Sequence, residues 1–155
     1  MLDRLLGLDD GDAIPMMDGV LRPNQRLDDA TPIGERVPEC DDVAVCADGA
    51  VLVSSGTRIL RLAGEGLRER TILAECPGAV GPLALDGPAV FAGVSGHGIV
   101  RIEGGVTVAR LENVAGQPLR CPTALARLPD GRLAIAEGSA HNAPEAWCRD
   151  LLERR

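Results

Sequence analysis

The sequence predicts an all-β protein built from a repeated unit of about 40 residues. Three Asp-Gly pairs each lie between two apolar runs, and they begin at residues 48, 86 and 130, which are 38 and 44 residues apart. Asp-Gly between apolar runs is a strong signal for a β-hairpin, because glycine adopts positive φ without steric cost. A four-stranded repeat of roughly 40–50 residues is typical of one blade of a β-propeller. We therefore expect a partial β-propeller.

The first repeat shows the pattern most clearly. Residues 38–62 read as three strands joined by two turns, and the last of these strands, 58–62, alternates polar and apolar residues. This period of two predicts a β-strand with one buried face. Residues 70–74 follow as a more polar fourth strand, which suits an edge because charged side chains protect an unpaired backbone. We expect the first blade to cover 37–77.

The second repeat, 78–120, contains the same elements. A tight hairpin is expected between 83–85 and 89–91, and an outer strand over 106–111 follows a Gly-Gly turn. The pattern therefore predicts four strands here as well.

The third repeat, 121–155, begins in the same way and then changes. Two strands are expected within 122–139, followed by a polar loop and a short C-terminal helix over 144–155, in which Pro144 takes the first helical position. The chain is thus expected to form about two and a half blades of a six-bladed type. A terminal blade exposes apolar faces, so we expect a second copy, a different chain or a missing C-terminal half to complete the array.

The first 36 residues lie outside the repeat. Pro, Asn, Asp and Gly recur at short intervals there, which is typical of an extended, turn-rich arm. We therefore expect two parts, an N-terminal arm over 1–36 and a partial propeller over 37–155.

Composition limits the core and the partners. The chain has no Tyr, one Phe and one Trp, so the core is expected to consist of Leu, Val, Ile and Ala. The net charge is −7, and most of the excess acid lies in the first 50 residues. An acidic chain with almost no aromatic side chains argues against nucleic-acid binding.

The cysteines and the N-terminus bear on the compartment. Five Cys and no C-x-x-C motif indicate reduced thiols that pack as small apolar residues. The sequence has no apolar run long enough for a membrane span and no signal peptide, so a soluble, cytoplasmic protein is expected.

Several segments carry a resemblance to a known family. Residues 18–28 resemble the N-terminal arm of bacterial strictosidine-synthase-like proteins, which belong to the gluconolactonase and regucalcin superfamily of six-bladed β-propellers. Pro38-Glu39 is similar to their Gly-Pro-Glu or Glu-Gly-Pro site at the mouth of the first inner strand. Residues 122–139, followed by 144–151, resemble their third blade and the helical loop after it. The resemblance covers nearly all of this chain but about half of the family's fold.

The resemblance implies a metal-dependent hydrolase of the lactonase or esterase type. In that family a divalent cation, usually calcium, is held by a Glu of the first blade and by Asn and Asp residues of later blades, and it polarises the ester carbonyl. Glu39 is accordingly the expected metal ligand, and Arg120 is expected to hold a substrate oxygen. The family's Arg-x-Asn-Asp pattern reads Arg120-Cys121-Pro122-Thr123 here, so two of its substrate contacts are missing.

Other residues have both a functional and a structural interpretation. His97 lies in a Gly-rich turn and is a candidate for substrate binding at the channel mouth, or an ordinary exposed loop residue. The same alternatives apply to His141, while Glu137 either faces the channel or completes a strand-end turn. No catalytic residue can be assigned.

Two functions remain open. The first is part of a hydrolase acting on a small lactone or ester. Calcium would bind in the completed propeller and not tightly to this chain alone, because one carboxylate does not supply enough oxygen ligands. A second chain, or a missing C-terminal half, would complete the site. The alternative is a non-catalytic propeller fragment that serves as a binding or assembly module.

Overall fold

The computed structural model describes residues 22–23, 26, 28–139, 142, 146 and 149. The chain divides into two units, 1–32 and 33–155, and all assigned strands belong to the second unit. Most of the expected arm over 1–36 and of the expected helix over 144–155 lies outside the described residues, as does His141. Those expectations stay predictions.

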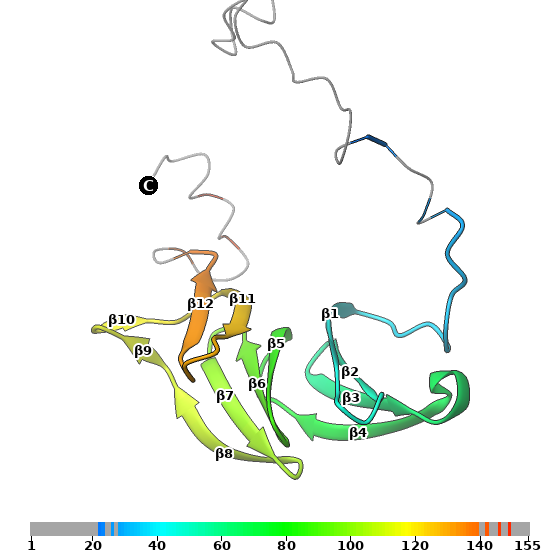
Figure 1. Ribbon diagram of the computed structural model, residues 1–155. Coiled ribbons are helices and arrows are strands. Elements are labelled where there is room, and N and C mark those ends of the chain that lie inside the picture. Colours follow the sequence, from blue (N-terminus) through cyan, green and yellow to red (C-terminus); the bar gives the residue numbers. More distant parts are fainter. Residues whose placement is uncertain are drawn as a thin grey trace, which may run out of the picture. The chain divides into compact units, whose positions relative to one another are not determined.

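The prediction of an all-β protein is confirmed for the part of the chain that is described. All strands pair antiparallel, in the orders β1-β2-β3-β4, β5-β6-β7-β8, β9-β10 and β11-β12 (Figure 1). We call the first two sheet 1 and sheet 2, and the β11–β12 pair sheet 3. The strands are β1 (Cys40–Val45), β2 (Val51–Ser55), β3 (Arg58–Ala63), β4 (Glu69–Glu75), β5 (Val80–Asp86), β6 (Ala89–Val94), β7 (Gly98–Glu103), β8 (Val106–Leu111), β9 (Asn113–Val114), β10 (Gln117–Pro118), β11 (Pro122–Arg127) and β12 (Leu133–Glu137).

The Asp-Gly turns form where the sequence predicts them. In the first turn Gly49 has φ 82°, and the Cys46 N–H donates to the carbonyl of Ala50 at 2.8 Å. The third turn repeats this geometry, with a 2.8 Å bond from Leu128 N–H to the carbonyl of Arg132. The middle hairpin is tighter, since β5 ends at the Asp and β6 begins three residues later.

The three repeats share a second backbone feature. The first strand of each, β1, β5 and β11, shows a register shift near its start, which is typical of a β-bulge. The residue just before each of these strands accepts a hydrogen bond from the first residue after the second strand of the same repeat. The donor–acceptor pairs are Gly56 N to Glu39 O at 3.2 Å, Ser95 N to Ala79 O at 2.8 Å and Gly138 N to Cys121 O at 2.7 Å.

The core lies between sheets 1 and 2. Ile59 of sheet 1 is fully buried, and so are Ala92 and Val94 of sheet 2. Only Ala, Val, Leu and Ile occur among the buried hydrophobic residues that are described, as the composition predicts. Strand β5 contacts both β1 and β11, so the first strands of the three repeats are neighbours in space (Figure 1).

The opposite face of sheet 1 is only partly covered. Val53, Leu60 and Leu62 are buried there, and Val37 and Leu67 pack on them from the entering segment and from the short 3₁₀ turn η2 (Glu65–Leu67). At the edges of the same face, Val43, Val45 and Ile72 remain more than half exposed. The expected exposure of a terminal apolar face is therefore confined to its margins.

Two features complete the description. The β9–β10 hairpin is a feature that the sequence pattern does not predict, since no strand is expected between residues 111 and 122. Its turn places Ala115 at φ 50° and Gly116 at φ 80°, and alanine rarely adopts positive φ, so the sequence carries no clear turn signal. In the described residues no helix is long and apolar enough to cross a membrane.

Candidate functional site

The starts of β1, β5 and β11 meet at one pocket of about 400 Å³, which we call the strand-start pocket. All three elements place the residue before or at their first position on its wall. The lining residues are Glu39, Asp41, Ala79, Val80, Gly81, Ser95, Cys121, Pro122 and Thr123. The expected metal ligand, Glu39, is thus brought together with residues of the second and third repeats.

Glu39 is held by its own backbone and by the next turn. Its carbonyl accepts the Gly56 N–H, and its φ of 51° lies in the left-handed region, which is strained for a residue other than glycine. Its carboxylate lies over Gly56, because a Cβ at that position would come within 2.6 Å of Glu39 Oε2. The absence of a side chain at 56 therefore makes room for the Glu39 carboxylate.

Asp41 is a second carboxylate of the pocket that the sequence interpretation missed. Its Oδ2 lies against Gly81 of β5, at 3.1 Å from the position that a Cβ would take there. Regular strand alternation does not predict this pairing with Glu39, because Glu39 precedes β1 with φ 51° and β1 has a register shift between Cys40 and Val43. Both acidic side chains are exposed.

The next carboxylate, Asp42, has a different environment. Its Oδ2 accepts a 2.8 Å hydrogen bond from the backbone N–H of Leu83 in sheet 2. Its own N–H donates to the hydroxyl of Ser54 at 2.7 Å, and that hydroxyl, which is fully buried, donates to the Asp42 carbonyl at 3.3 Å. Asp42 therefore joins sheet 1 to sheet 2.

The donors on the strand-start pocket suit a hard cation in kind and fall short in number. Carboxylate and hydroxyl oxygens are ligands that Ca²⁺ accepts, but Ca²⁺ takes six to eight of them. Within the described part of the chain, no group of three or more His, Cys, Asp or Glu is placed to hold a metal ion. Glu39 and Asp41 therefore form part of such a site at most.

Arg120 and His97 come together at a neighbouring pocket of about 310 Å³. Both residues are exposed, and they share this pocket with Glu112 and Asn113. This pocket adjoins the strand-start pocket. Ser95 and Cys121 line the strand-start pocket, and their chain neighbours Gly96 and Arg120 line this one. The Gly96 N–H also donates a hydrogen bond to the Arg120 carbonyl at 2.7 Å. Two of the three predicted site residues thus share one pocket, and Glu39 lies in the next.

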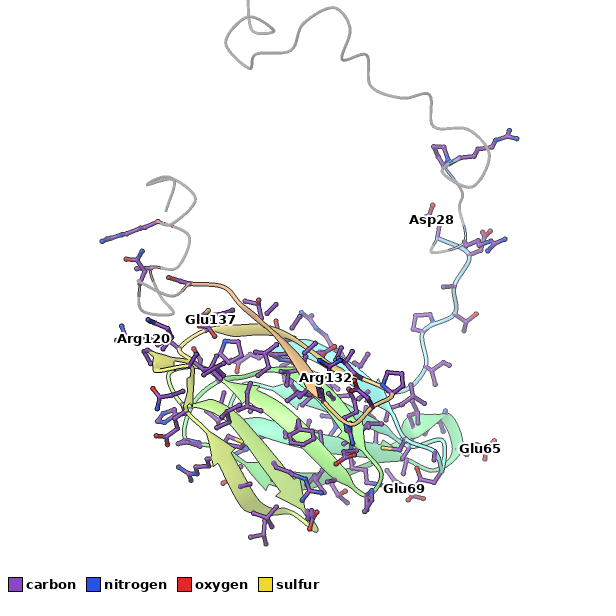
Figure 2. The ribbon with its side chains drawn as sticks, turned by 60° about the vertical axis from the view of Figure 1, so that its left-hand side comes forward. Asp28, Glu65, Glu69, Arg120, Arg132 and Glu137 are labelled. Atoms are coloured by element: carbon purple, nitrogen blue, oxygen red, sulfur yellow. The ribbon has the colours of Figure 1, made fainter. Side chains whose placement is uncertain are left out.

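Glu137 explains how Arg120 is positioned. Its Oε1 accepts hydrogen bonds from the backbone N–H groups of Arg120, at 3.0 Å, and of Cys121. Figure 2 shows Arg120 and Glu137 at the same end of the molecule. The other oxygen, Oε2, is buried and has no hydrogen-bond partner among the described residues. Of its two interpretations, the structure supports a strand-end role, which fastens the segment entering β11 to the end of β12.

Among the described residues, four titratable groups outside these two pockets have shifted pKa values. The pKa of Asp48 is lowered by the Ala50 N–H and by Arg61, and the pKa of Asp130 is lowered by the Arg132 side chain and N–H. Burial raises the pKa of the Cys46 and Cys76 thiols. All four shifts have structural causes, so they identify no acid or base for catalysis.

Comparison with known proteins adds no further assignment. No protein-family model matches this chain, and no curated protein has a matching sequence. The functional interpretation therefore depends on the geometry of the two pockets.

Proposed function

We propose that the chain is a sector of a six-bladed β-propeller hydrolase that acts on a small lactone or ester, and that it supplies part of a cation-dependent site. The observation that carries this proposal is the strand-start pocket, on which the equivalent ends of β1, β5 and β11 meet with the carboxylates of Glu39 and Asp41. In a propeller the first strands of the blades line a central channel, so in the proposed complete ring the pocket would lie at one end of that channel.

The residues of the chain would take distinct roles. Glu39 and Asp41 would each give carboxylate oxygens to a divalent cation, and the adjoining Arg120 would bind a substrate oxygen. A bound cation would act as a Lewis acid on the ester carbonyl. The missing oxygen ligands would come from residues outside the described part of the chain or from a partner.

Cation binding tests the proposal directly. Calcium titration of the whole chain by calorimetry is expected to show weak binding, roughly millimolar as in sites with few protein ligands. The variants Glu39→Gln and Asp41→Asn should each weaken it. Glu65→Gln is the matched control, because Glu65 is an exposed carboxylate on the η2 turn and does not line the strand-start pocket. Equal affinities in all four proteins would remove Glu39 and Asp41 from the site.

Hydrolysis is the second measurement. Release of acid from γ-butyrolactone and from phenyl acetate, measured with calcium and again with a chelator, separates a cation-dependent hydrolase from a protein that only binds cations. Loss of turnover in both Glu39→Gln and the chelated wild type is the expected result for any preparation in which the site is complete.

A non-catalytic binding or assembly module is the second candidate. The observation that favours it is sheet 3, in which the described part of the chain forms two strands where sheets 1 and 2 have four. A sheet with an open edge is suited to association with another chain. Calcium binding that does not depend on Glu39 or Asp41, together with tight association with a partner protein, would favour this function over hydrolysis.

A further inference from the structure

The second strand of sheet 3 has an open edge. In sheets 1 and 2 the second strand is paired on both sides, since β2 lies between β1 and β3, and β6 lies between β5 and β7. The equivalent strand, β12, pairs with β11 and has no strand on its other side among the described residues. Such an edge presents N–H and C=O groups to which a further strand can bind.

The repeats indicate which side chains belong opposite β12. Because the first and third turns have the same hydrogen bonds, Leu133, Ala134 and Ile135 are equivalent to residues 51–53. In sheet 1 the residues paired with 51–53 are Leu62, Arg61 and Leu60. Sheet 2 has the same order opposite β6, with Ile102, Arg101 and Val100. Both third strands therefore place an arginine between two branched apolar residues.

The arginine has a defined partner in each complete sheet. Arg61 contacts Asp48 of the first Asp-Gly turn at 2.6 Å. Arg101 lies 3.6 Å from Asp86 of the second turn, and it also pairs with Glu103, while Arg127 of β11 contacts Asp86 at 3.0 Å. The third turn offers Asp130, whose side chain is about half exposed and is paired with Arg132 of the same turn at 2.7 Å. By its equivalence to Asp48, the Asp130 carboxylate lies within reach of an arginine placed opposite Ala134.

An apolar groove of about 520 Å³ lies beside the open edge. It runs between β12 and the β8–β9 region, and in Figure 1 the edge of β12 away from β11 lies on the side of β8 and the β9–β10 hairpin. Its lining residues are Leu111, Val114, Leu119, Arg132, Leu133, Ile135 and Glu137. Side chains opposite Leu133 and Ile135 would share their face of the sheet and enter this groove.

The residues that directly follow β12 do not carry the required pattern. In sheet 1 the third strand begins three residues after the second ends. Residues 139–144 here read Ser-Ala-His-Asn-Ala-Pro, without an arginine or a branched apolar residue. Residues 139–144 therefore do not supply an apolar-Arg-apolar segment opposite β12.

We propose that the open edge of β12 and the adjoining groove bind an extended segment of another polypeptide by strand addition, with the order apolar-Arg-apolar. The arginine pairs with Asp130, and the flanking side chains fill the groove. The inference deepens the proposed function because it names the partner segment. Its test measures peptide binding and not cation binding or hydrolysis, so either idea can fail without the other.

The probe is a fluorescein-labelled synthetic peptide with the sequence of residues 57–64, Thr-Arg-Ile-Leu-Arg-Leu-Ala-Gly, which contains β3. Its fluorescence anisotropy is measured on titration with the whole chain. It should bind saturably and about tenfold more tightly than a scrambled peptide, since scrambling removes the cross-strand pairs. A second peptide carries Gln in place of the arginine that corresponds to Arg61. It should bind the wild-type protein about two- to fivefold more weakly than the original peptide does. The difference between the two peptides should be smaller for the Asp130→Asn protein, because that variant lacks the carboxylate that pairs with the arginine.

Two substitutions on the protein locate the binding edge. Ala134 and Ala126 lie directly opposite each other in sheet 3 and are both exposed. Ala134→Arg places a like charge beside the incoming arginine and should weaken peptide binding, while Ala126→Arg, on β11 and away from the open edge, should leave it unchanged. Far-ultraviolet circular dichroism checks that both variants are folded.

Three results would overturn the proposal. They are no saturable binding, equal binding of the scrambled peptide, or equal effects of the two arginine substitutions. Sedimentation velocity tests a fourth outcome, in which the chain associates with a second copy of itself. If Ala134→Arg abolishes this self-association and the peptide does not displace it, the partner at this edge is a second copy of the chain and not a separate polypeptide.

Discussion

Replacing Asp42 by Ala is expected to loosen the junction of sheets 1 and 2. The Asp42 carboxylate accepts the Leu83 N–H across this junction at 2.8 Å, and Leu83 is only 6% exposed. Removing the acceptor leaves a buried donor without a partner, which costs about 1–3 kcal/mol. The bond from Val43 N–H to the same carboxylate is also lost, but water replaces it because that site is exposed. We expect the free energy of unfolding to fall by about 2 kcal/mol.

Urea denaturation of the whole chain measures this loss. Asp41→Ala is the matched control, since Asp41 precedes Asp42 and is exposed, and it should change stability by less than about 0.5 kcal/mol. Asp42→Asn should lie between the two, because an amide oxygen still accepts a hydrogen bond but a neutral bond has about half the strength. Amide hydrogen exchange at Leu83 should accelerate in Asp42→Ala. If Asp42→Ala is as stable as Asp41→Ala, the junction does not depend on this bond.

Three further predictions follow from single features. Gly93→Ala should destabilise the protein by about 1–3 kcal/mol in urea, because its Cβ would meet Pro82 and Pro122 within 2.9 Å, whereas Gly81→Ala, which meets the movable Asp41 carboxylate at 3.1 Å, should cost less. The pKa values of Asp48 and Asp130 are lowered on folding, so both carboxylates stabilise the folded state at pH values above their ordinary pKa of 3.8. This stabilisation is lost as the pH falls through their lower folded pKa values. The melting temperature below pH 4 should therefore depend less on pH when both residues are replaced by Asn. Iodoacetamide should modify the exposed Cys40 faster than Cys76, because burial raises the pKa of the Cys76 thiol. Peptide mass spectrometry measures both rates, which should become equal when the protein is unfolded in urea.

The repeated sheets could be predicted because their signals are local. Each Asp-Gly turn specifies its hairpin within a few residues, and the alternation in 58–62 indicates a strand without any tertiary information. The β9–β10 hairpin lacks both signals, since its strands have two residues each and its turn needs Ala115 at positive φ. Its formation depends on contacts that the local sequence does not encode.

The site was less predictable because its geometry is not local. The position of Glu39 before β1 follows from register, as the same spacing separates Cys121 from the third Asp-Gly turn. Which of the carboxylates at 39, 41 and 42 faces the pocket is decided by a bulge and by a backbone N–H that lies 41 residues further along the chain. Likewise, Glu137 holds residues 16 and 17 positions before it, and no sequence pattern links them.

The two proposed surfaces should respond independently to mutation. Glu39 lines the strand-start pocket at the beginning of β1, whereas Ala134 lies on β12, and neither residue lines the other's site. Effects of substitutions at sites that share no partner usually add. Glu39→Gln should therefore weaken calcium binding and leave peptide affinity unchanged, and Ala134→Arg should do the reverse. In the double variant, calorimetry and anisotropy should each give the value of the relevant single variant. If adding the peptide instead changes calcium affinity in the wild type, and Glu39→Gln abolishes that change, the bound strand affects the cation site and the two surfaces are coupled.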